Sequence, residues 1–295
     1  MFRRGEAVST PTPRLCASAP VPARFYVDAA LAPQLEIDLP AGASRHAQVL
    51  RLQPGDAVTL FDGRGGEHAA IVLTMGRSAV RVRVEAFHNI DRELPLHVTL
   101  AVGMPANERM DGLVEKATEL GVSVLQPLHC QRSVLRLNGE RALKKVAHWQ
   151  AVAQSATEQS GRTRLPIVAP VQDLGAWLAG LPARPTGAGQ RPVQRASCDG
   201  AGARLVLSLA GASPWAAASG PHRVGATAQR WIGLSGPEGG LTSEEEALAR
   251  QHGFCSISLG PRVLRADTAP LALLAQLAQL AQLAYLHDRP NQGHE

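Results

Sequence analysis

Aromatic residues, lysine and cysteine are scarce in this sequence, and it contains no long apolar run. No segment approaches the roughly 20 consecutive apolar residues that a membrane-spanning helix needs, so we expect no membrane association. The four cysteines are scattered, with neither metal-ligand spacing nor the density of a disulfide framework. These absences predict a cytoplasmic protein with reduced thiols and no bound metal.

The motifs of several common enzyme classes are also missing. No Gly-Lys-Ser or Gly-Lys-Thr occurs, so a P-loop is not supported, and no Gly-x-Ser-x-Gly elbow marks a serine hydrolase. The glycine-rich stretch 236–240 does not follow the Gly-x-Gly-x-x-Gly pattern of dinucleotide-binding folds. Any ligand site in this chain must therefore be built in another way.

Positive charge is carried almost entirely by arginine. The net charge is +5, and the only lysines are Lys116, Lys144 and Lys145. Arginine suits phosphate and base recognition because its planar guanidinium donates hydrogen bonds in a fixed fork. A general preference for arginine codons would produce the same composition, so the charge permits a polyanionic partner without requiring one.

The segment 24–92 has the pattern of a small β domain. Valines at 80, 82 and 84 alternate with charged residues, as in a half-buried strand, and glycine-rich turns separate the other apolar runs. This pattern predicts a small β-barrel, interrupted by one helix at 44–52. In a barrel that binds RNA, the candidate phosphate contacts are Arg24, Arg45 and Arg51. Alternatively, these arginines belong to a solvated face.

The segment 93–288 alternates between strand and helix patterns. A continuous apolar run at 98–102, typical of a strand buried on both faces, is followed by a helix from about Asn107. A strand at 122–128 and a helix at 140–158 come next. Such alternation predicts an α/β domain with a mostly parallel sheet and right-handed crossovers.

Three segments lie outside these two domains. Residues 1–23 are rich in arginine and proline, and we expect a disordered extension or a wrongly assigned start codon. Residues 182–203 have no periodicity and predict a flexible insertion, and 289–295 form a short tail.

Two glycine-bearing loops, 232–242 and 259–269, follow strands near the end of the chain. Parallel sheets bind ligands at the carboxyl ends of their strands, and glycines let the backbone approach a ligand closely. Thr242 and Glu245 have the spacing of a capping box, which predicts a helix start with free N–H groups. We therefore expect the two loops to hold one small cofactor, with Leu259 and Leu264 on either side of an adenine-like ring.

Two further features concern partners. Leucines recur every three residues from 274 to 286, so they spiral around the last helix and demand burial on more than one face. A second copy of the chain would bury the extra face, and an interior helix of a monomer is the alternative. The stretch 129–164 is the most basic in the chain and is either an RNA-facing edge or a solvated surface.

Five blocks of sequence, in this order, resemble the signature blocks of one enzyme family. They are Asn107–Val122, Gln131-Arg132-Ser133, Glu158–Arg162, Gly236–Thr242 and Leu259–Arg265. The blocks resemble those of the ribosomal RNA uridine-N3 methyltransferases, which belong to the SPOUT class of S-adenosylmethionine-dependent enzymes. The resemblance covers residues 24–288.

This resemblance implies a PUA-like barrel for RNA, followed by an α/β domain whose last segment is threaded as a trefoil knot. It also implies a homodimer through the α/β domain, a role in ribosome biogenesis, and methylation of N3 of a uridine near the decoding centre of 16S rRNA. Two positions depart from the family pattern, because Ala266 and Asp267 replace the usual Thr and Glu. These changes put cofactor affinity in doubt.

The matching blocks supply candidate site residues. The expected cofactor contacts are Leu207, Leu209, Gly236, Pro237, Glu238, Gly239, Gly240, Leu259, Gly260, Val263, Leu264, Arg265 and Thr268. The candidate catalytic residues are Arg109, Arg132, Arg162, Glu238 and Arg265. The expected RNA contacts, beyond the three arginines of the barrel, are Lys116, Arg132, Arg136, Arg162 and Arg164.

The chemistry assigns roles to these residues. N3 of uridine must lose its imide proton, and negative charge grows on the uracil oxygens, which arginines would stabilise. Glu238 could orient the cofactor, accept the proton, or satisfy nearby N–H groups as a turn residue, and Glu115 is a further candidate base. Two other functions remain open: an RNA-binding ribosome-assembly factor without turnover, and a SPOUT enzyme acting on another RNA base.

Overall fold

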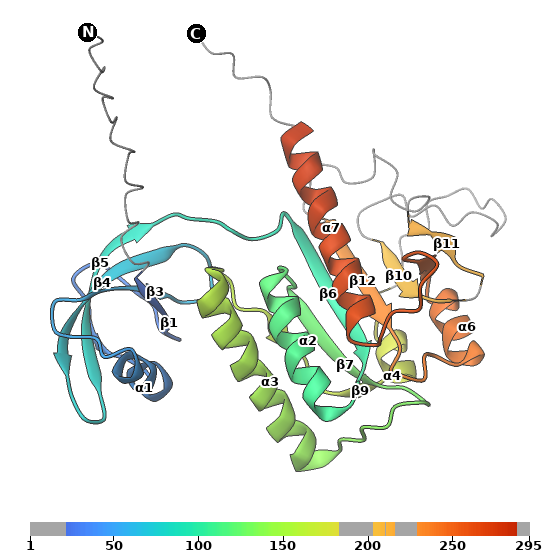
Figure 1. The fold of residues 1–295 in the computed structure, drawn as a ribbon, viewed down its shortest axis with the longest axis horizontal. Coiled ribbons are helices and arrows are strands. Elements are labelled where there is room, and N and C mark those ends of the chain that lie inside the picture. The colour runs from blue at the N-terminus through green and yellow to red at the C-terminus, as the bar shows by residue number, and fades with distance from the viewer. Residues whose placement is uncertain (1–21, 183–202, 210, 216–228, 288–295) are drawn as a thin grey trace, which may run out of the picture.

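The computed structural model describes residues 22–182, 203–209, 211–215 and 229–287, which form two units (Figure 1). The first contains β1 Ala23–Tyr26, β2 Glu36–Asp38, α1 Ala41–Val49, β3 Ala57–Phe61, β4 Glu67–Met75 and β5 Val80–His88. The second begins with β6 Leu96–Gly103, α2 Asn107–Glu119, β7 Val124–His129, α3 Gly139–Ser160, β8 Ile167–Val168, β9 Gln172–Asp173 and α4 Leu174–Ala179. It ends with β10 Arg204–Leu207, β11 Ser213–Pro214, β12 Gln229–Ser235, α6 Ser243–Gln251, β13 Cys255–Ser258 and α7 Thr268–His287.

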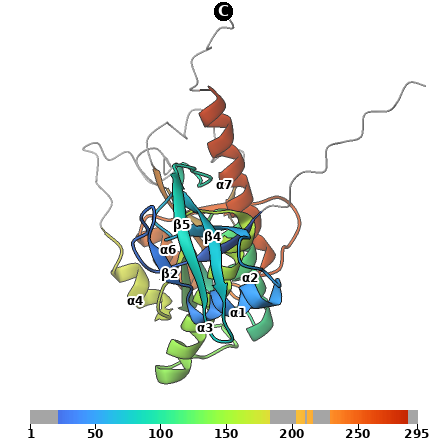
Figure 2. The same cartoon turned by 90° about the vertical axis from the view of Figure 1, so that its left-hand side faces the viewer.

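The first unit is a five-stranded sheet in the order β1-β3-β4-β5-β2, and its longest strands, β4 and β5, run side by side (Figure 2). The predicted alternation in β5 holds, since Val80, Val82 and Val84 are buried in the core of this unit. The helix α1 starts at Ala41, three residues before the expected start, because Pro40 at its N-cap can begin a helix but not continue one. It ends at Val49, and Arg51 beyond it has a left-handed φ of 55°.

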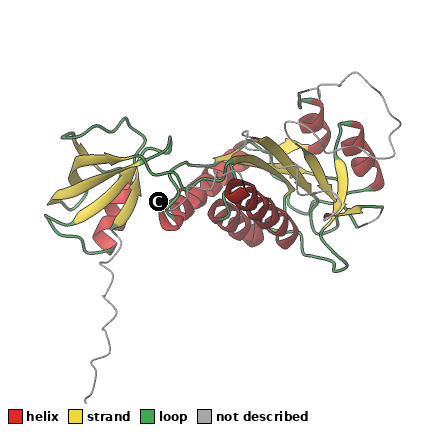
Figure 3. Ribbon diagram, turned by 90° about the horizontal axis from the view of Figure 1, so that it is seen from above, coloured by secondary structure: helices red, strands yellow, loops and turns green. Residues whose placement is uncertain are grey.

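The second unit is a parallel sheet in the order β11-β13-β10-β12-β6-β7-β8, with β9 also pairing with β7. Helices cover both of its faces (Figure 3). Neighbouring residues on one strand belong to different cores: Leu100 packs with α2, α3 and α7, whereas Ala101 packs with α4 and α6. The continuous apolar run at 98–102 is therefore explained by burial on both faces, and the predicted parallel α/β sheet is confirmed.

The helix ends follow local sequence signals. The helix α3 stops at Gly161, whose φ of 75° breaks the helical conformation. The expected capping box is present at α6: the Thr242 hydroxyl accepts from the Glu245 amide at 3.2 Å, and the Glu245 carboxylate accepts from the Thr242 amide at 2.9 Å.

The last helix, α7, lies across the sheet against β12, β6 and α2. In the described part of α7, Leu273, Leu274, Leu277 and Ala281 are buried and form one stripe along the helix, whereas Leu280 is only partly buried. In the described part, one face of the leucine spiral is thus buried within the chain. The side chains of Leu283 and Leu286 lie outside the described residues, as do most of the predicted extension, insertion and tail.

Two features of the described residues concern membranes and metals. None of the helices there has both the length and the apolar character that crossing a membrane requires. The same residues contain no cluster of three or more histidine, cysteine or acidic side chains suited to a metal ion.

The capping box makes a testable contribution to stability. Replacing Thr242 with Ala removes the side-chain acceptor at the N-cap, so we expect a loss of about 1 kcal/mol in the free energy of unfolding. Urea denaturation followed by circular dichroism measures this loss. Ser243→Ala, an exposed change one residue further on, is the control and should leave the midpoint unchanged. Equal midpoints for the two variants would contradict the role of the cap.

Candidate functional site

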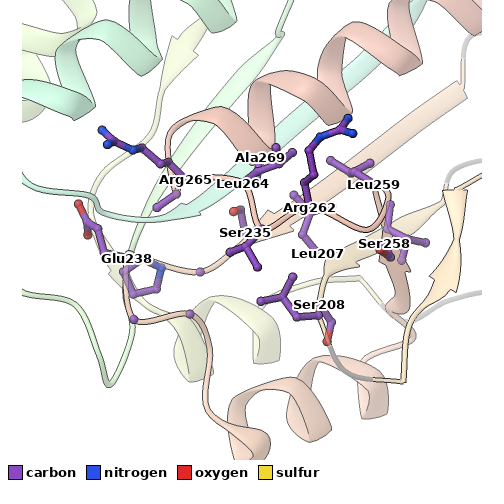
Figure 4. A pocket seen from close by; sticks show the side chains of 18 of the residues that line it. Leu207, Ser208, Ser235, Glu238, Ser258, Leu259, Arg262, Leu264, Arg265 and Ala269 are labelled. Atoms are coloured by element: carbon purple, nitrogen blue, oxygen red, sulfur yellow. The ribbon is translucent and has the colours of Figure 1, made fainter.

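A pocket of about 440 Å³ opens at the carboxyl ends of β10, β12 and β13 (Figure 4). Parallel sheets typically bind ligands at this edge. The pocket is lined by Arg109, Leu207, Ser208, Leu209, Ser235, Gly236, Pro237, Glu238, Gly239, Gly240, Ile257, Ser258, Leu259, Gly260, Arg262, Val263, Leu264, Arg265, Ala266 and Ala269. Both predicted loops therefore face one cavity.

The first loop turns sharply where β12 ends, and bare backbone makes the turn possible. A Cβ at Gly236 would lie 2.6 Å from the Leu241 nitrogen and 2.7 Å from the Gly240 carbonyl carbon. A Cβ at Gly103, where β6 ends, would lie 2.6 Å from the Pro237 nitrogen. Because these neighbours are backbone or a rigid ring, no side chain fits at either position. The loop thus rests directly on the end of the sheet.

The second loop supplies an apolar wall. Leu259 and Leu264 face the pocket together with Leu207 from the end of β10 (Figure 4). Arg262 and Arg265 leave the same loop in different directions, and Val263 is exposed at 77%. The pocket therefore combines apolar side chains, loop backbone and arginine at its rim.

Glu238 ties the first loop to the start of α2. Its carboxylate accepts a hydrogen bond from the Ala106 amide at 3.0 Å, and it lies 3.5 Å from the guanidinium of Arg109. Ala106 is the N-cap of α2, where free amides and the helix dipole favour a negative group. Glu238 therefore satisfies a nearby N–H group in this structure, which is one of the three roles expected for it.

Arg132 holds the same loop from the opposite side. Its guanidinium donates to the Gly239 carbonyl at 2.8 Å and to the Leu241 carbonyl at 3.4 Å. The neighbouring Gln131 amide donates to Glu245 of the capping box at 2.7 Å. Beneath the loop, burial raises the pKa of the Cys130 thiol to about 12, so this cysteine stays protonated. Arg132 does not line the pocket and acts by fixing the loop.

Comparison with known proteins identifies the family. An RNA methyltransferase domain model matches residues 92–278, and an RNA methyltransferase PUA domain model matches residues 39–85. The chain is 31% identical to the ribosomal RNA small subunit methyltransferase E of Bacillus subtilis, over 76% of this chain and 81% of the relative. The chain belongs to the ribosomal RNA small subunit methyltransferase E family.

Solved structures agree with this assignment. The chain is similar to the methyltransferase E of Neisseria gonorrhoeae bound to S-adenosyl methionine, with a TM-score of 0.75 and 34% identity. It is also similar to a Legionella pneumophila methyltransferase in complex with the same cofactor, with a TM-score of 0.76 and 29% identity. Each comparison covers 88% of this chain and 98% of the other.

The residues expected to contact the cofactor line the pocket, with Thr268 as the exception. Thr268 starts α7, and its amide donates to the Arg265 carbonyl. The prediction missed several lining residues, namely Ser208, Ser235, Ile257, Ser258, Arg262, Ala266 and Ala269. Ser235, Arg262, Ala266 and Ala269 lie within the two predicted loops but were not singled out there. Ile257 and Ser258 end the strand before the second loop, and Ser208 follows β10, so extending the expected site into the strand ends would have found these three.

Two predicted functional arginines have structural roles instead. Arg162 was expected to act in catalysis and RNA binding, but it is buried, and its guanidinium bonds Glu93 and the carbonyls of Thr118 and Val122. Arg24 was expected to contact RNA, but its guanidinium pairs with Glu67 and donates to the Arg162 carbonyl. Neither side chain reaches the pocket or offers a free face to RNA, so both expectations are corrected.

The other predicted RNA contacts are exposed. Arg45 and Arg51 lie on and just beyond α1, Arg136 lies before α3, and Arg164 lies beside the loop that contains Arg64. Lys116 is also exposed, but hydrogen bonds to Glu115 and Glu119 raise its pKa. Glu115 is accordingly the partner of a lysine on the helix surface, and it does not line the pocket.

Proposed function

We propose that this chain transfers a methyl group from S-adenosylmethionine to N3 of a uridine in 16S rRNA, near the decoding centre. Family membership supports methyl transfer to small-subunit ribosomal RNA, and the relatives crystallised with the cofactor support its identity. The observation that carries the proposal is that both glycine loops line one pocket at the strand ends. The N3 position rests on the resemblance of the five sequence blocks.

The pocket residues fit this cofactor. A volume of about 440 Å³ suits a small-molecule site, and Leu207, Leu259 and Leu264 offer apolar surface to an adenine ring. Loop backbone at 236–240 can supply donors and acceptors for the polar groups. When bound, the cofactor supplies an electrophilic methyl group on a cationic sulfonium.

The chain's own residues must position the uracil and stabilise the charge that develops on it. Arg109 and Arg265 line the pocket, and we assign them as donors to the uracil oxygens. We assign Arg132 and Glu238 to holding the first loop. Arg132 donates to the Gly239 carbonyl of that loop, and Glu238, which belongs to the loop, accepts from the Ala106 amide at the start of α2. The target base must leave its stack to reach the pocket, and we assign RNA binding to the PUA-like unit through Arg45, Arg51 and Arg164.

Labelled cofactor tests the proposed reaction directly. Purified protein incubated with small subunits that lack the modification should place the label on N3 of one uridine, as mass mapping of nucleosides will report. Gly236→Ala should abolish both cofactor binding and labelling, because the added Cβ meets loop backbone. Gly112→Ala is the control, since open space surrounds that position.

The other outcomes separate the alternative functions. If cofactor binds but no label enters the RNA, the chain is an RNA-binding assembly factor. If the label appears on another base or in another RNA, the chain is a SPOUT enzyme of different specificity.

The role of Glu238 has its own test. Glu238→Gln keeps an oxygen that can accept the Ala106 N–H, so turnover should fall less than about tenfold, whereas loss of a general base costs about 10² to 10⁴. Turnover measured at saturating substrates over a range of pH distinguishes the two roles. A larger fall, with loss of the rising limb of the pH profile, would identify Glu238 as the proton acceptor.

We further propose a trefoil knot and a homodimer formed through the second unit. In support of the knot, β13 pairs with β10 inside the sheet, and the chain then returns as α7 across β12 and β6. In support of the dimer, Leu271 and Leu280 on α7 are only partly buried, and Val263 near its start is exposed. An experimental structure that traces residues 235–268 tests the knot.

Sedimentation velocity tests the dimer. The wild-type protein should sediment as a dimer, with twice the 31.2 kDa mass of one chain. Leu280→Gln should shift it toward the monomer, whereas Leu143→Gln, on an exposed part of α3, should not. A monomeric wild type at micromolar concentration would refute the proposal.

A further inference from the structure

The two units meet at the end of α3, and polar groups make this junction. Among the residues that the structure describes, none is shared between the hydrophobic core of the first unit and the two cores of the second. The relative orientation of the units therefore depends on the contacts around residues 158–165. The backbone carbonyls at the carboxyl end of a helix carry partial negative charge and lack hydrogen-bond partners within the helix, so this end attracts cations.

Two arginines donate to backbone carbonyls just beyond this helix end. Arg92, in the segment between β5 and β6, donates to the Gly161 carbonyl at 3.0 Å. Arg24, on β1, donates to the Arg162 carbonyl at 3.0 Å. Both guanidiniums thus bind the backbone just beyond the carboxyl end of α3, from the side of the first unit.

Glu67 on β4 organises both arginines. Its carboxylate pairs with Arg24 and accepts from Arg92 at 2.9 and 3.3 Å. Burial opposes ionisation of this carboxyl, but the hydrogen bonds from Arg92 and Arg24 outweigh it and hold its pKa below the ordinary value. We call Arg24, Glu67 and Arg92, with the two carbonyls, the Glu67 joint.

Further contacts surround the Glu67 joint. Glu93 accepts from the amides of Thr163 and Arg164, both at 3.0 Å, and pairs with Arg162. The Tyr26 amide of β1 donates to the Glu158 carboxylate at 3.0 Å. These charged groups hold one another in fixed positions, because removal of one partner would leave the others buried without a counter-charge, which is destabilising.

We propose that Glu67 is a positioning residue for RNA methylation: the Glu67 joint fixes the PUA-like unit so that RNA bound there presents its target base to the pocket. This inference rests on the proposed function. The PUA-like unit binds RNA at a distance from the reacting atoms, so a loose junction lets bound RNA sample many orientations. Substrate capture then suffers, while the cofactor pocket, built wholly within the second unit and its loops, is unaffected.

Glu67→Gln tests the proposal, with Asp38→Asn as its matched control. Asp38 also binds an arginine through two hydrogen bonds, to Arg81 at 2.9 and 3.0 Å, but both residues lie on the surface of the first unit. We expect Glu67→Gln to raise the KM for small subunits about tenfold, with kcat and cofactor affinity within about twofold of the wild type. Asp38→Asn should change none of these values.

Hydrogen exchange supplies a readout that is independent of activity. The amides of Tyr26, Thr163 and Arg164 donate to carboxylates at the junction, so they should exchange about tenfold faster in Glu67→Gln. Amides within β5 should keep their protection, which shows that the first unit is still folded. If Glu67→Gln does not fold, Arg92→Met, which removes a partly exposed arginine from the same joint, takes its place.

The outcomes distinguish the two proposals. If amides exchange faster in Glu67→Gln but the wild type transfers no methyl group, the structural role of the Glu67 joint is supported and the enzyme assignment is refuted. Unchanged exchange, or an unchanged KM in an active and folded variant, would overturn the positioning role. A fall in cofactor affinity with an unchanged KM would also overturn it.

Discussion

The contact of Pro237 with the bare backbone of Gly103 is the constraint on which the site depends. It brings the first loop onto the ends of the parallel strands, and the second loop then closes the cavity with an apolar wall. A loop standing further from the sheet would leave a shallow groove in place of the pocket. The tight turn at Gly236 serves the same end, since loop backbone occupies the space that a side chain would need.

Charged side chains then hold the first loop in the conformation that the glycines allow. Glu238 fastens the loop to the start of α2, and Arg132 fastens it from the loop after β7. These two residues come from distant parts of the chain, yet both hold the same few residues of backbone. A preorganised loop of this kind binds a cofactor with little loss of conformational freedom, which favours affinity. Glu67 acts on a larger scale, since it organises the cations that join the two units.

Local patterns were sufficient for much of the fold. The alternating valines of β5, the apolar run of β6 and the capping box of α6 each act over a few residues, and each was expected. The helix α1 begins three residues before the expected start, directly after Pro40 at its N-cap. The pocket loops were found because glycines and strand ends mark such loops even without knowledge of the sheet order.

Local sequence patterns did not reveal the roles of individual charged residues. Arg162 and Arg24 have the same chemistry as the exposed Arg45 and Arg164, and the sequence does not distinguish a guanidinium that meets Glu93 or Glu67 from one that meets solvent. The sequence by itself determined the elements, the parallel sheet and the two glycine loops, because these follow from short-range periodicity and backbone preference. Only the tertiary structure decided which cations face the pocket and which join the units, because ion pairs form between residues that are distant in the chain and adjacent only once it is folded.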